Sequence, residues 1–126
     1  MATTDKPKVL HEDDHILAIN KPAGWLIHAD VGRRSLLTWA HEREVSAGRD
    51  PEQLLLVHRL DKDTSGVVLM ARSKEITATL GKAFATRQVL KMYLAITWPC
   101  PSVRWAKPEL NLRAKRIQGG ERMEVI

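Results

Sequence analysis

The sequence predicts an α+β fold built on a mixed, largely antiparallel sheet with a few packed helices. Short apolar runs bounded by Gly, Pro, Asn and Asp outnumber the stretches with helical periodicity, and several neighbouring runs are close enough in the chain to pair antiparallel. The chain has 126 residues, of which 44% are hydrophobic, so it is long enough to form a core. We expect a flexible polar start over residues 1–7 and one folded region over residues 8–126.

The first half of the chain predicts two strands and one helix. "KVLH", residues 8–11, and "HILAIN", residues 15–20, indicate strands on either side of an acidic turn. The second run is apolar at consecutive positions, which is typical of a strand that is buried on both faces. Ser35 is expected to cap a helix over residues 36–47, and Gly48 is expected to end it.

The second half predicts further strands around another helix. "LLLV", residues 54–57, and "VVLMA", residues 67–71, indicate two buried strands. Ser73 is expected to cap a helix from Lys74 to about Thr86, because apolar side chains recur there at helical spacing. "LKMYLAIT", residues 90–97, predicts one more strand.

Composition limits the classes of partner and the cellular location. The net charge of +5 and the sequence pI of about 9.7 favour a polyanionic partner such as a nucleic acid. No apolar run is long enough to span a membrane, and the first residues contain no apolar segment of a secretory signal. The single cysteine excludes an internal disulfide framework and a cysteine zinc cluster. We therefore expect a cytoplasmic protein with no membrane and no metal among its partners.

A polar stretch, "HRLDKDTSG" at residues 58–66, joins the two apolar strands just described. Its last four residues, from Asp63 onwards, are turn formers. Arg59 and Asp61 instead continue the preceding strand, in which residues two apart point to the same face. We expect the guanidinium beside Asp61 to keep this carboxylate ionised and to hold its direction.

This stretch is similar to the signature of the RluA-type RNA pseudouridine synthases, HRLD-x-x-TSG, and it has every fixed position of that pattern. "HEDDHILAINKPAGWLIH", residues 11–28, resembles the opening strands of the family and its NKP-A-G turn. "FATRQVLKMYLAI", residues 84–96, resembles the family block F-x-x-R-x-V-x-K-x-Y-L-A. The resemblance covers residues 8–98 and implies an incomplete pseudouridine synthase-like fold, with residues 8–126 as the N-terminal portion of a catalytic domain.

The resemblance implies an isomerase that converts uridine to pseudouridine in structured RNA, either ribosomal RNA or transfer RNA. The bond from N1 to C1′ breaks, the uracil turns within the site, and C5 bonds to C1′. The reaction is redox neutral and takes no group from outside, so neither a cofactor nor a metal is expected. By the resemblance Asp61 is the catalytic carboxylate. It either attacks C1′ as a nucleophile or promotes loss of the 2′ proton, and the sequence leaves both routes open.

Further site residues follow from the same resemblance. Arg59 is expected to help displace the target nucleotide, because a stacked base is inaccessible to the enzyme. By the resemblance Tyr93 is expected to stack on the target base and is also a candidate proton acceptor, whereas its position in an apolar strand, taken alone, favours a core aromatic. Lys21 is either an RNA contact or part of a turn that ends a strand. The expected RNA-binding residues are Lys21, Arg59, Lys62, Arg87 and Lys91.

Other polar and aromatic residues receive expectations without a catalytic role. His58 is expected to be a hydrogen-bonded core histidine or a group that stabilises the turn. The tryptophans are not regularly interleaved with basic residues, which favours core or edge packing over a stacking platform; they are Trp25, Trp39, Trp98 and Trp105. Additional cations would contact phosphate if they share a face; they are Arg33, Arg34, Arg113, Lys115 and Arg116.

The sequence departs from the family near its end, where "RMEVI" predicts a short strand. Family members continue with more sheet and a block of the type R-x-H-Q-I-R-x-H, and this chain contains no such block. A catalytically inactive RNA-binding fragment is therefore an alternative to the enzyme. A further alternative is a fragment that folds only with its missing half or as an oligomer, since open sheet edges favour self-association. A glycosidase that uses Asp61 and Asp63 is the remaining chemical rival.

Overall fold

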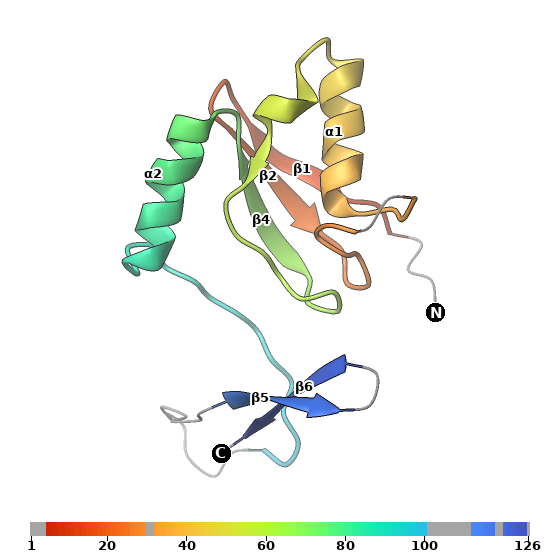
Figure 1. Cartoon of the computed structure of the whole chain (residues 1–126), viewed down its shortest axis with the longest axis vertical. Helices are drawn as coiled ribbons and strands as arrows, with labels where there is room; N and C mark the ends of the chain where they lie inside the picture. Colours follow the sequence, from red (N-terminus) through yellow and green to blue (C-terminus); the bar gives the residue numbers. More distant parts are fainter. Residues whose placement is uncertain (1–4, 30–31, 101–111, 118–119, 126) are drawn as a thin grey trace. The chain divides into compact units, whose positions relative to one another are not determined.

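The computed structural model describes residues 5–29, 32–100, 112–117 and 120–125, and the chain divides into two compact units, residues 1–91 and 92–126. The first unit contains a four-stranded antiparallel sheet with two helices (Figure 1), which confirms the predicted α+β class. Its strands lie in the order β1-β2-β4-β3, so that β1 and β3 are the edges. Of the predicted flexible start, residues 1–4 lie outside the described residues. The strands are β1 (Lys8–Glu12), β2 (Ile16–Lys21), β3 (Leu55–Leu56) and β4 (Gly66–Ala71).

The central strand β2 determines where the loops of this unit come together. Its residues Leu17 to Ile19 are all buried, as the consecutive apolar run predicts. β2 pairs with β4 in a continuous antiparallel register that ends with Lys21 opposite Gly66. This register brings the turn after β2 and the loop before β4 to the same end of the sheet (Figure 1).

Helix α1 (Leu36–Ser46) covers one face of this sheet and closes the core. Ser35 caps it as predicted: the Ser35 hydroxyl accepts from the Thr38 N–H at 3.2 Å, and the Thr38 hydroxyl accepts from the Ser35 N–H at 2.8 Å. Gly48, with a φ of 73°, follows the helix in the left-handed conformation that glycine adopts readily. The core cluster consists of Leu17, Ile19, Ile27, Leu36, Ala40, Leu54, Val68 and Met70.

Helix α2 (Lys74–Ala85) lies beside β4 and β3 (Figure 1) and begins at the predicted cap, Ser73. Its end is a Schellman motif: the Arg87 N–H donates to the Phe84 oxygen at 3.2 Å, and the Gln88 N–H donates to the Ala83 oxygen at 2.9 Å. Arg87 has a φ of 57°, which costs a non-glycine residue about 1 kcal/mol. The direction in which the chain leaves α2 is therefore set by a mildly strained arginine.

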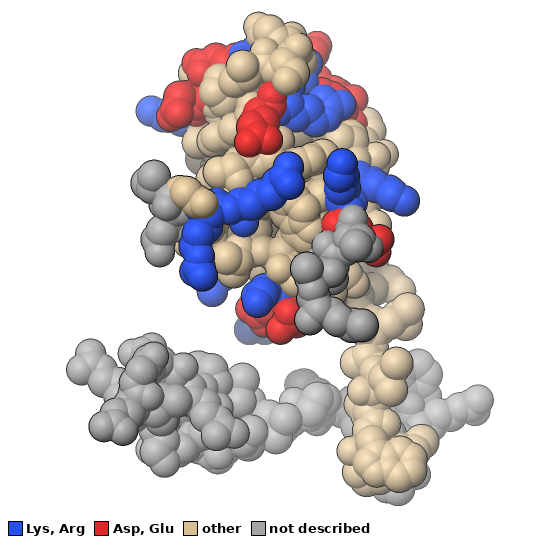
Figure 2. Space-filling model, turned by 90° about the vertical axis from the view of Figure 1, so that its right-hand side faces the viewer, with Lys and Arg blue, Asp and Glu red and all other residues tan. Residues whose placement is uncertain are grey.

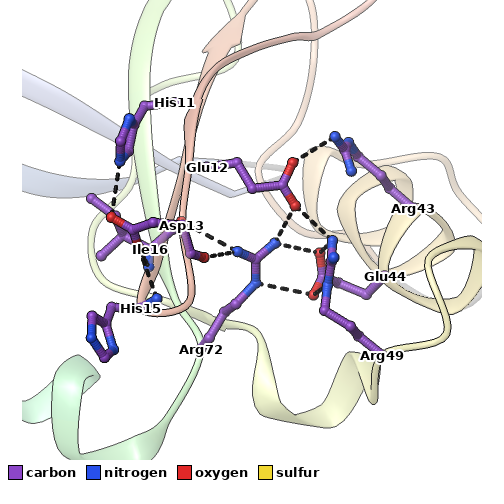
Figure 3. Close-up of polar contacts among 9 residues, drawn as sticks. All are labelled: His11, Glu12, Asp13, His15, Ile16, Arg43, Glu44, Arg49 and Arg72. Atoms are coloured by element: carbon purple, nitrogen blue, oxygen red, sulfur yellow. Dashed lines mark hydrogen bonds and ion pairs between the residues drawn. The ribbon is translucent and has the colours of Figure 1, made fainter.

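A network of ion pairs joins α1 to the sheet (Figure 3). Glu44 is only 1% exposed, and its carboxylate accepts from Arg49 at 2.7 and 2.8 Å and from Arg72 at 2.9 Å. Glu12, at the end of β1, accepts from Arg72 and Arg49 at 2.6 Å and from Arg43 at 2.7 Å. The Arg49 hydrogen bond, helped by Arg72 and opposed by burial, lowers the pKa of Glu44 to about 2. The sequence patterns did not predict this network.

The second unit corrects one prediction and adds a hairpin. Residues 90–97 form no strand, so the predicted strand is wrong here, and the ladders that the structure describes contain none of these residues. Without a neighbouring strand the backbone groups have no ladder partners, and large side chains such as Leu94 stay exposed. Strands β5 (Leu112–Ile117) and β6 (Gly120–Val125) form an antiparallel pair. β6 confirms the predicted terminal strand, whereas β5 was not predicted.

Candidate active site

The loop of residues 57–65, between β3 and β4, presents Asp61 to solvent. Arg59 and Asp61 are exposed, and Leu60 between them is half-buried and packs against the core cluster. The predicted alternation therefore continues beyond β3, although β3 itself is shorter than predicted. An exposed carboxylate whose neighbouring side chain is held in the core has a defined position and free access to a ligand.

A buried contact holds the backbone immediately after Asp61. The carbonyl oxygen of Lys62 accepts from the Lys21 ammonium at 2.9 Å and from the Gly24 N–H at 2.8 Å. Gly24 has a φ of 86°, a conformation that glycine adopts without strain, so the NKPAG turn closes onto the loop at this point. In a third hydrogen bond the Thr64 N–H donates to the backbone carbonyl oxygen of Asp61 at 3.1 Å, which closes the turn that follows Asp61.

Lys21 is completely buried, and its ammonium is used within the protein. Its Nζ donates to the oxygens of Pro22 at 3.1 Å, Trp25 at 3.0 Å and Lys62 at 2.9 Å. An ammonium has three N–H bonds, so none is left for a phosphate. Burial lowers the pKa of Lys21, and the nearby carboxylates of Asp63 and Asp61 partly oppose this. This placement favours a positioning role for Lys21 over the predicted direct contact with RNA.

His58 anchors the other end of the loop. Its Nε2 accepts from the Leu69 N–H of β4 at 3.0 Å, so the neutral ring carries its proton on Nδ1. Its ring also stacks on Phe84 of α2, with 4.6 Å between centroids. Burial, and to a lesser extent the charge of Lys91, lowers the pKa of His58. This geometry combines the two roles expected from the sequence. His58 is a hydrogen-bonded, half-buried histidine, and it stabilises the loop.

Arg59 and Asp61 lie on the same loop but do not form an ion pair. Among the residues that the structure describes, neither side chain has an oppositely charged partner within 4.0 Å. The direct contact expected from their spacing is therefore not formed. The anchors hold the backbone on either side of Asp61, while the side chains of Asp61 and Arg59 are exposed at the surface.

The other predicted site residues are spread over both units. Lys62 and Arg87 are exposed, and the Lys91 ammonium lies 5.4 Å from the centroid of the Phe84 ring. Tyr93 belongs to the second unit, and its side chain is 64% exposed. Arg113, Lys115 and Arg116 fall in β5, where only the backbone is described, and Trp105 lies outside the described residues. The structure thus places Arg59, Asp61 and Lys62 together on one loop.

Within the described part of the chain, no three His, Cys, Asp or Glu side chains gather closely enough to hold a metal ion. In the same part, no helix has the length and apolar character needed to cross a membrane. The anchors Gly24 and Leu60 were not predicted as determinants of the site, whereas His58 was expected to be a hydrogen-bonded core histidine or a group that stabilises the turn. The only sequence signal for Gly24 and Leu60 was their position inside the two motifs.

Comparison with known proteins places these motifs in a family. The sequence model of the family described as RNA pseudouridylate synthase matches residues 15–120. The chain is 34% identical to tRNA pseudouridine synthase C of Pectobacterium carotovorum, covering 76% of this chain and 25% of that protein. It is 39% identical to ribosomal large subunit pseudouridine synthase D of Xylella fastidiosa, covering 70% and 27%. These matches confirm the family resemblance that the sequence indicates.

A mitochondrial relative and a solved structure agree. The chain is 33% identical to pseudouridylate synthase RPUSD4, mitochondrial, of Mus musculus, covering 89% of this chain and 30% of that protein. The solved structure of human RNA pseudouridylate synthase domain containing 4 superposes with a TM-score of 0.53 at 31% identity, covering 64% of this chain and 30% of that chain. The chain thus spans between a quarter and about a third of the length of these relatives.

Proposed function

Because the chain belongs to the RNA pseudouridylate synthase family, we propose that it isomerises uridine to pseudouridine in structured RNA, with Asp61 as the catalytic carboxylate. One observation carries the assignment of the residue. Asp61 is exposed, while the backbone on either side is held by the packing of Leu60 and by the two hydrogen bonds that the Lys62 backbone oxygen accepts, from the buried Lys21 ammonium and from the Gly24 N–H. A fixed, accessible carboxylate is what a reaction at the anomeric carbon of an extruded nucleotide needs.

The proposed reaction breaks the bond from N1 to C1′ and leaves its electron pair on N1. In one route the Asp61 carboxylate bonds to C1′; in the other it promotes loss of the 2′ proton, which later returns. The uracil then turns and C5 bonds to C1′; in the first route the bond between Asp61 and C1′ breaks at this step and its electron pair returns to the carboxylate. The hydrogen on C5 then leaves as a proton, and N1 takes up a proton. Either route needs Asp61 ionised, because a protonated carboxyl group is neither a good nucleophile nor a base.

Arg59 and Tyr93 are proposed to act on the target nucleotide. Arg59 is exposed two residues before Asp61, where a guanidinium can contact phosphate or fill the space that the extruded base leaves. Tyr93 is proposed to stack on the uracil, and its exposed side chain is available for such a contact. Lys62, Arg87 and Lys91 are proposed as phosphate contacts, and Lys21 as the positioning residue of the loop.

The test is the loss of tritium from RNA transcribed with uridine that is tritiated at C5. Bond formation at C5 releases this label, so the assay reports the isomerisation itself. Asp61→Asn should abolish release because an amide cannot supply the carboxylate, whereas Asp63→Asn, on the same exposed turn, should retain it. Equal release by the wild type and Asp61→Asn would remove Asp61 from the mechanism.

A second candidate is an RNA-binding chain that does not convert uridine. Residues 92–97 form no strand, and Tyr93 is exposed, so the described part of the chain contains no ladder or burial that would orient the ring. In this case the wild type and Asp61→Asn should bind RNA equally, and neither should release tritium. Binding together with release by the wild type alone would exclude this candidate.

The RNA substrate, the cellular location and the assembly remain proposals. Relatives are named for transfer RNA and for the large ribosomal subunit, so both transcripts should be assayed side by side. We propose a cytoplasmic location, which imaging of a tagged chain would test against the mitochondrial location in the name of another relative. Self-association through the edge strands β1 and β3 would appear as a concentration-dependent mass in light scattering.

A further inference from the structure

A hollow of about 280 Å³ opens beside α1, and Asp61 is not among its lining residues. It is bounded by one side of the helix, by the turn after β2 and by the segment before β1. Its volume lies just under the roughly 300–1,000 Å³ of drug-sized ligand pockets, so it suits a small group such as one nucleotide. The lining residues are Lys6, Trp25, Arg34, Trp39, Glu42, Arg43 and Ser46.

The charge of this hollow is predominantly positive. Three of its residues are cationic and one is acidic. Arg43 is paired with Glu12 at 2.7 Å, whereas Lys6 and Arg34 have no carboxylate within 4.0 Å among the described residues. On the α1 side of the molecule, Lys and Arg side chains gather in a band across the middle of the face (Figure 2). Unpaired cations at a surface hollow favour an anionic ligand such as a phosphodiester.

Two tryptophans supply the apolar part of the hollow. Trp25 is half-buried, and its indole N–H donates to the backbone carbonyl oxygen of Asp5 at 3.0 Å, which holds the ring in place. Trp39 is half-buried and packs against the core cluster. The Arg34 guanidinium lies 5.7 Å from the centroid of the Trp25 ring. Partly exposed aromatic rings beside cations are the combination that binds single-stranded nucleic acids by stacking and charge.

This hollow bears on the expectation that the tryptophans pack in the core or at edges rather than form a stacking platform. Trp25 and Trp39 do rest on the protein, but the fold brings Lys6 and Arg34 to the same hollow. Aromatic and basic residues need not alternate along the sequence to form a stacking surface, because these four side chains come from three separate segments that the fold brings together.

The hollow is connected to the Asp61 loop through Lys21. The backbone oxygens of Trp25 and Lys62 both accept from the Lys21 ammonium, at 3.0 and 2.9 Å, so the two oxygens are no more than about 6 Å apart. Asp61 directly precedes Lys62, and Trp25 lines the hollow. The two features therefore lie on adjoining turns at one end of the sheet, close enough for one RNA strand to contact both.

We propose that this hollow binds a nucleotide of single-stranded RNA that flanks the target uridine, with its base against Trp25 or Trp39 and its phosphate on Lys6 and Arg34. The choice of RNA as the ligand rests on the proposed function. The hollow would hold the strand that runs from the extruded nucleotide, and so contribute to affinity without contacting the reacting atoms.

The first test reverses one charge at the hollow and one elsewhere. Fluorescein-labelled oligouridine is titrated with the full chain, with Arg34→Glu, and with the control Lys74→Glu, which makes the same charge change at an exposed position of α2. Arg34→Glu should weaken binding about 10-fold and lower the slope of log Kd against log salt by about 0.7, the value for one single-strand phosphate contact. Lys74→Glu should change Kd less than 2-fold. Equal effects of the two variants would overturn the proposal.

The second test concerns the aromatic surface. Trp25→Phe keeps a ring and should bind oligouridine within about 2-fold of wild type, whereas Trp25→Ala should bind about 5-fold more weakly or worse. A thermal melt of each variant accompanies the titration, since Trp25 also bonds to Asp5. If Trp25→Ala melts normally and binds oligouridine as well as wild type, stacking on Trp25 is refuted. If Trp25→Ala does not fold, the titration of Arg34→Glu alone decides whether the hollow binds RNA.

The outcome for the hollow is separable from that for the enzyme. Tritium release that depends on Asp61, together with equal binding by Arg34→Glu and Lys74→Glu, would support the proposed function and reject the hollow. Weakened binding by Arg34→Glu alone, without tritium release by the wild type, would support the hollow and reject the enzyme.

Discussion

The ammonium of Lys21 donates a hydrogen bond to the backbone oxygen of Lys62 across 41 residues of chain, with 2.9 Å between nitrogen and oxygen. The lysine is wholly buried and binds two more carbonyl oxygens in its own turn. A charge without access to water is tolerated only where hydrogen bonds replace the solvent. The NKP turn and the loop of the proposed catalytic carboxylate therefore depend on one another.

Replacing Lys21 by Met should destabilise the chain and misplace the loop. Met retains most of the volume but removes the ammonium from all three carbonyl oxygens, of which the Lys62 oxygen keeps the Gly24 N–H as its one donor, so we expect the free energy of unfolding to fall by about 3 kcal/mol. Urea denaturation measures this change. Lys62→Met is the matched control, because its side chain is exposed and its carbonyl is unaffected; it should cost less than about 0.5 kcal/mol. Equal losses in both variants would contradict a positioning role.

The buried carboxylate of Glu44 should make stability depend on acid pH. Its pKa in the fold is about 2, against 4.5 ordinarily, so the unfolded chain takes up its proton first as the pH falls. The contribution is fully present above about pH 4.5 and is lost as the pH falls towards 2. Glu44→Gln should flatten the dependence in this window and cost about 3–5 kcal/mol at pH 7.

The control for Glu44 lies on the same helix. Glu42 is exposed and belongs to no ion pair among the described residues, so Glu42→Gln should keep both the stability at pH 7 and its acid dependence. Urea denaturation at several values between pH 7 and pH 2.5 gives both quantities. An unchanged acid profile in Glu44→Gln would place the source of the dependence elsewhere in the network.

His58 should add a second, milder pH dependence nearer neutrality. Its pKa is lowered in the fold by burial and then by Lys91, so the unfolded chain binds a proton more readily. Its contribution is complete above about pH 6.5 and declines below it. Thermal melts at pH 7.5 and pH 5.5 should differ more for the wild type than for His58→Gln, whose amide oxygen can accept from Leu69 without titrating. A wild-type difference that His58→Gln reproduces would assign the titration to another group.

Arg87 offers a test that separates folding from RNA binding. It adopts a φ of 57°, so Arg87→Gly should raise the free energy of unfolding by about 0.5–1 kcal/mol by relieving the left-handed strain. Removal of the charge should at the same time weaken binding of transcribed RNA in a salt-dependent way. Arg87→Ala should lose the same binding without the gain in stability. RNA affinity equal to wild type in both variants would exclude Arg87 from the phosphate contacts.

Tyr93 distinguishes stacking from proton transfer. If the ring stacks on the target base, Tyr93→Phe should keep the RNA affinity within about 2-fold, and Tyr93→Ala should weaken it about 5-fold or more. Tritium release by Tyr93→Phe then reports the hydroxyl: a fall of about 10²–10⁴-fold is expected for a lost proton acceptor, and near-normal release for stacking alone. We expect stacking, because the exposed aromatic ring is available to a base and a neutral phenol is a weak proton acceptor.

Local signals predicted the elements of the first unit well. Ser35 and Ser73 cap the two helices as expected, because N-caps depend on a side chain and a backbone group only a few residues apart. The exposure of Arg59 and Asp61 on either side of Leu60 also follows from a local alternation. The strand predicted for residues 90–97 was wrong because its apolar pattern states what the segment would bury, not whether another strand lies beside it.

The sequence by itself determined the family, through motifs whose residues are contiguous, and it placed Asp61 beside Arg59 at the end of an apolar strand. The tertiary structure alone decided that Lys21 is buried under the loop of Asp61, that Glu44 is buried among arginines, and that Arg34 lies over Trp25. The physical reason is distance along the chain. A polar group can be buried only where partners from other segments replace its water, and only the register of β2 with β4 and the packing of α1 bring those partners within reach.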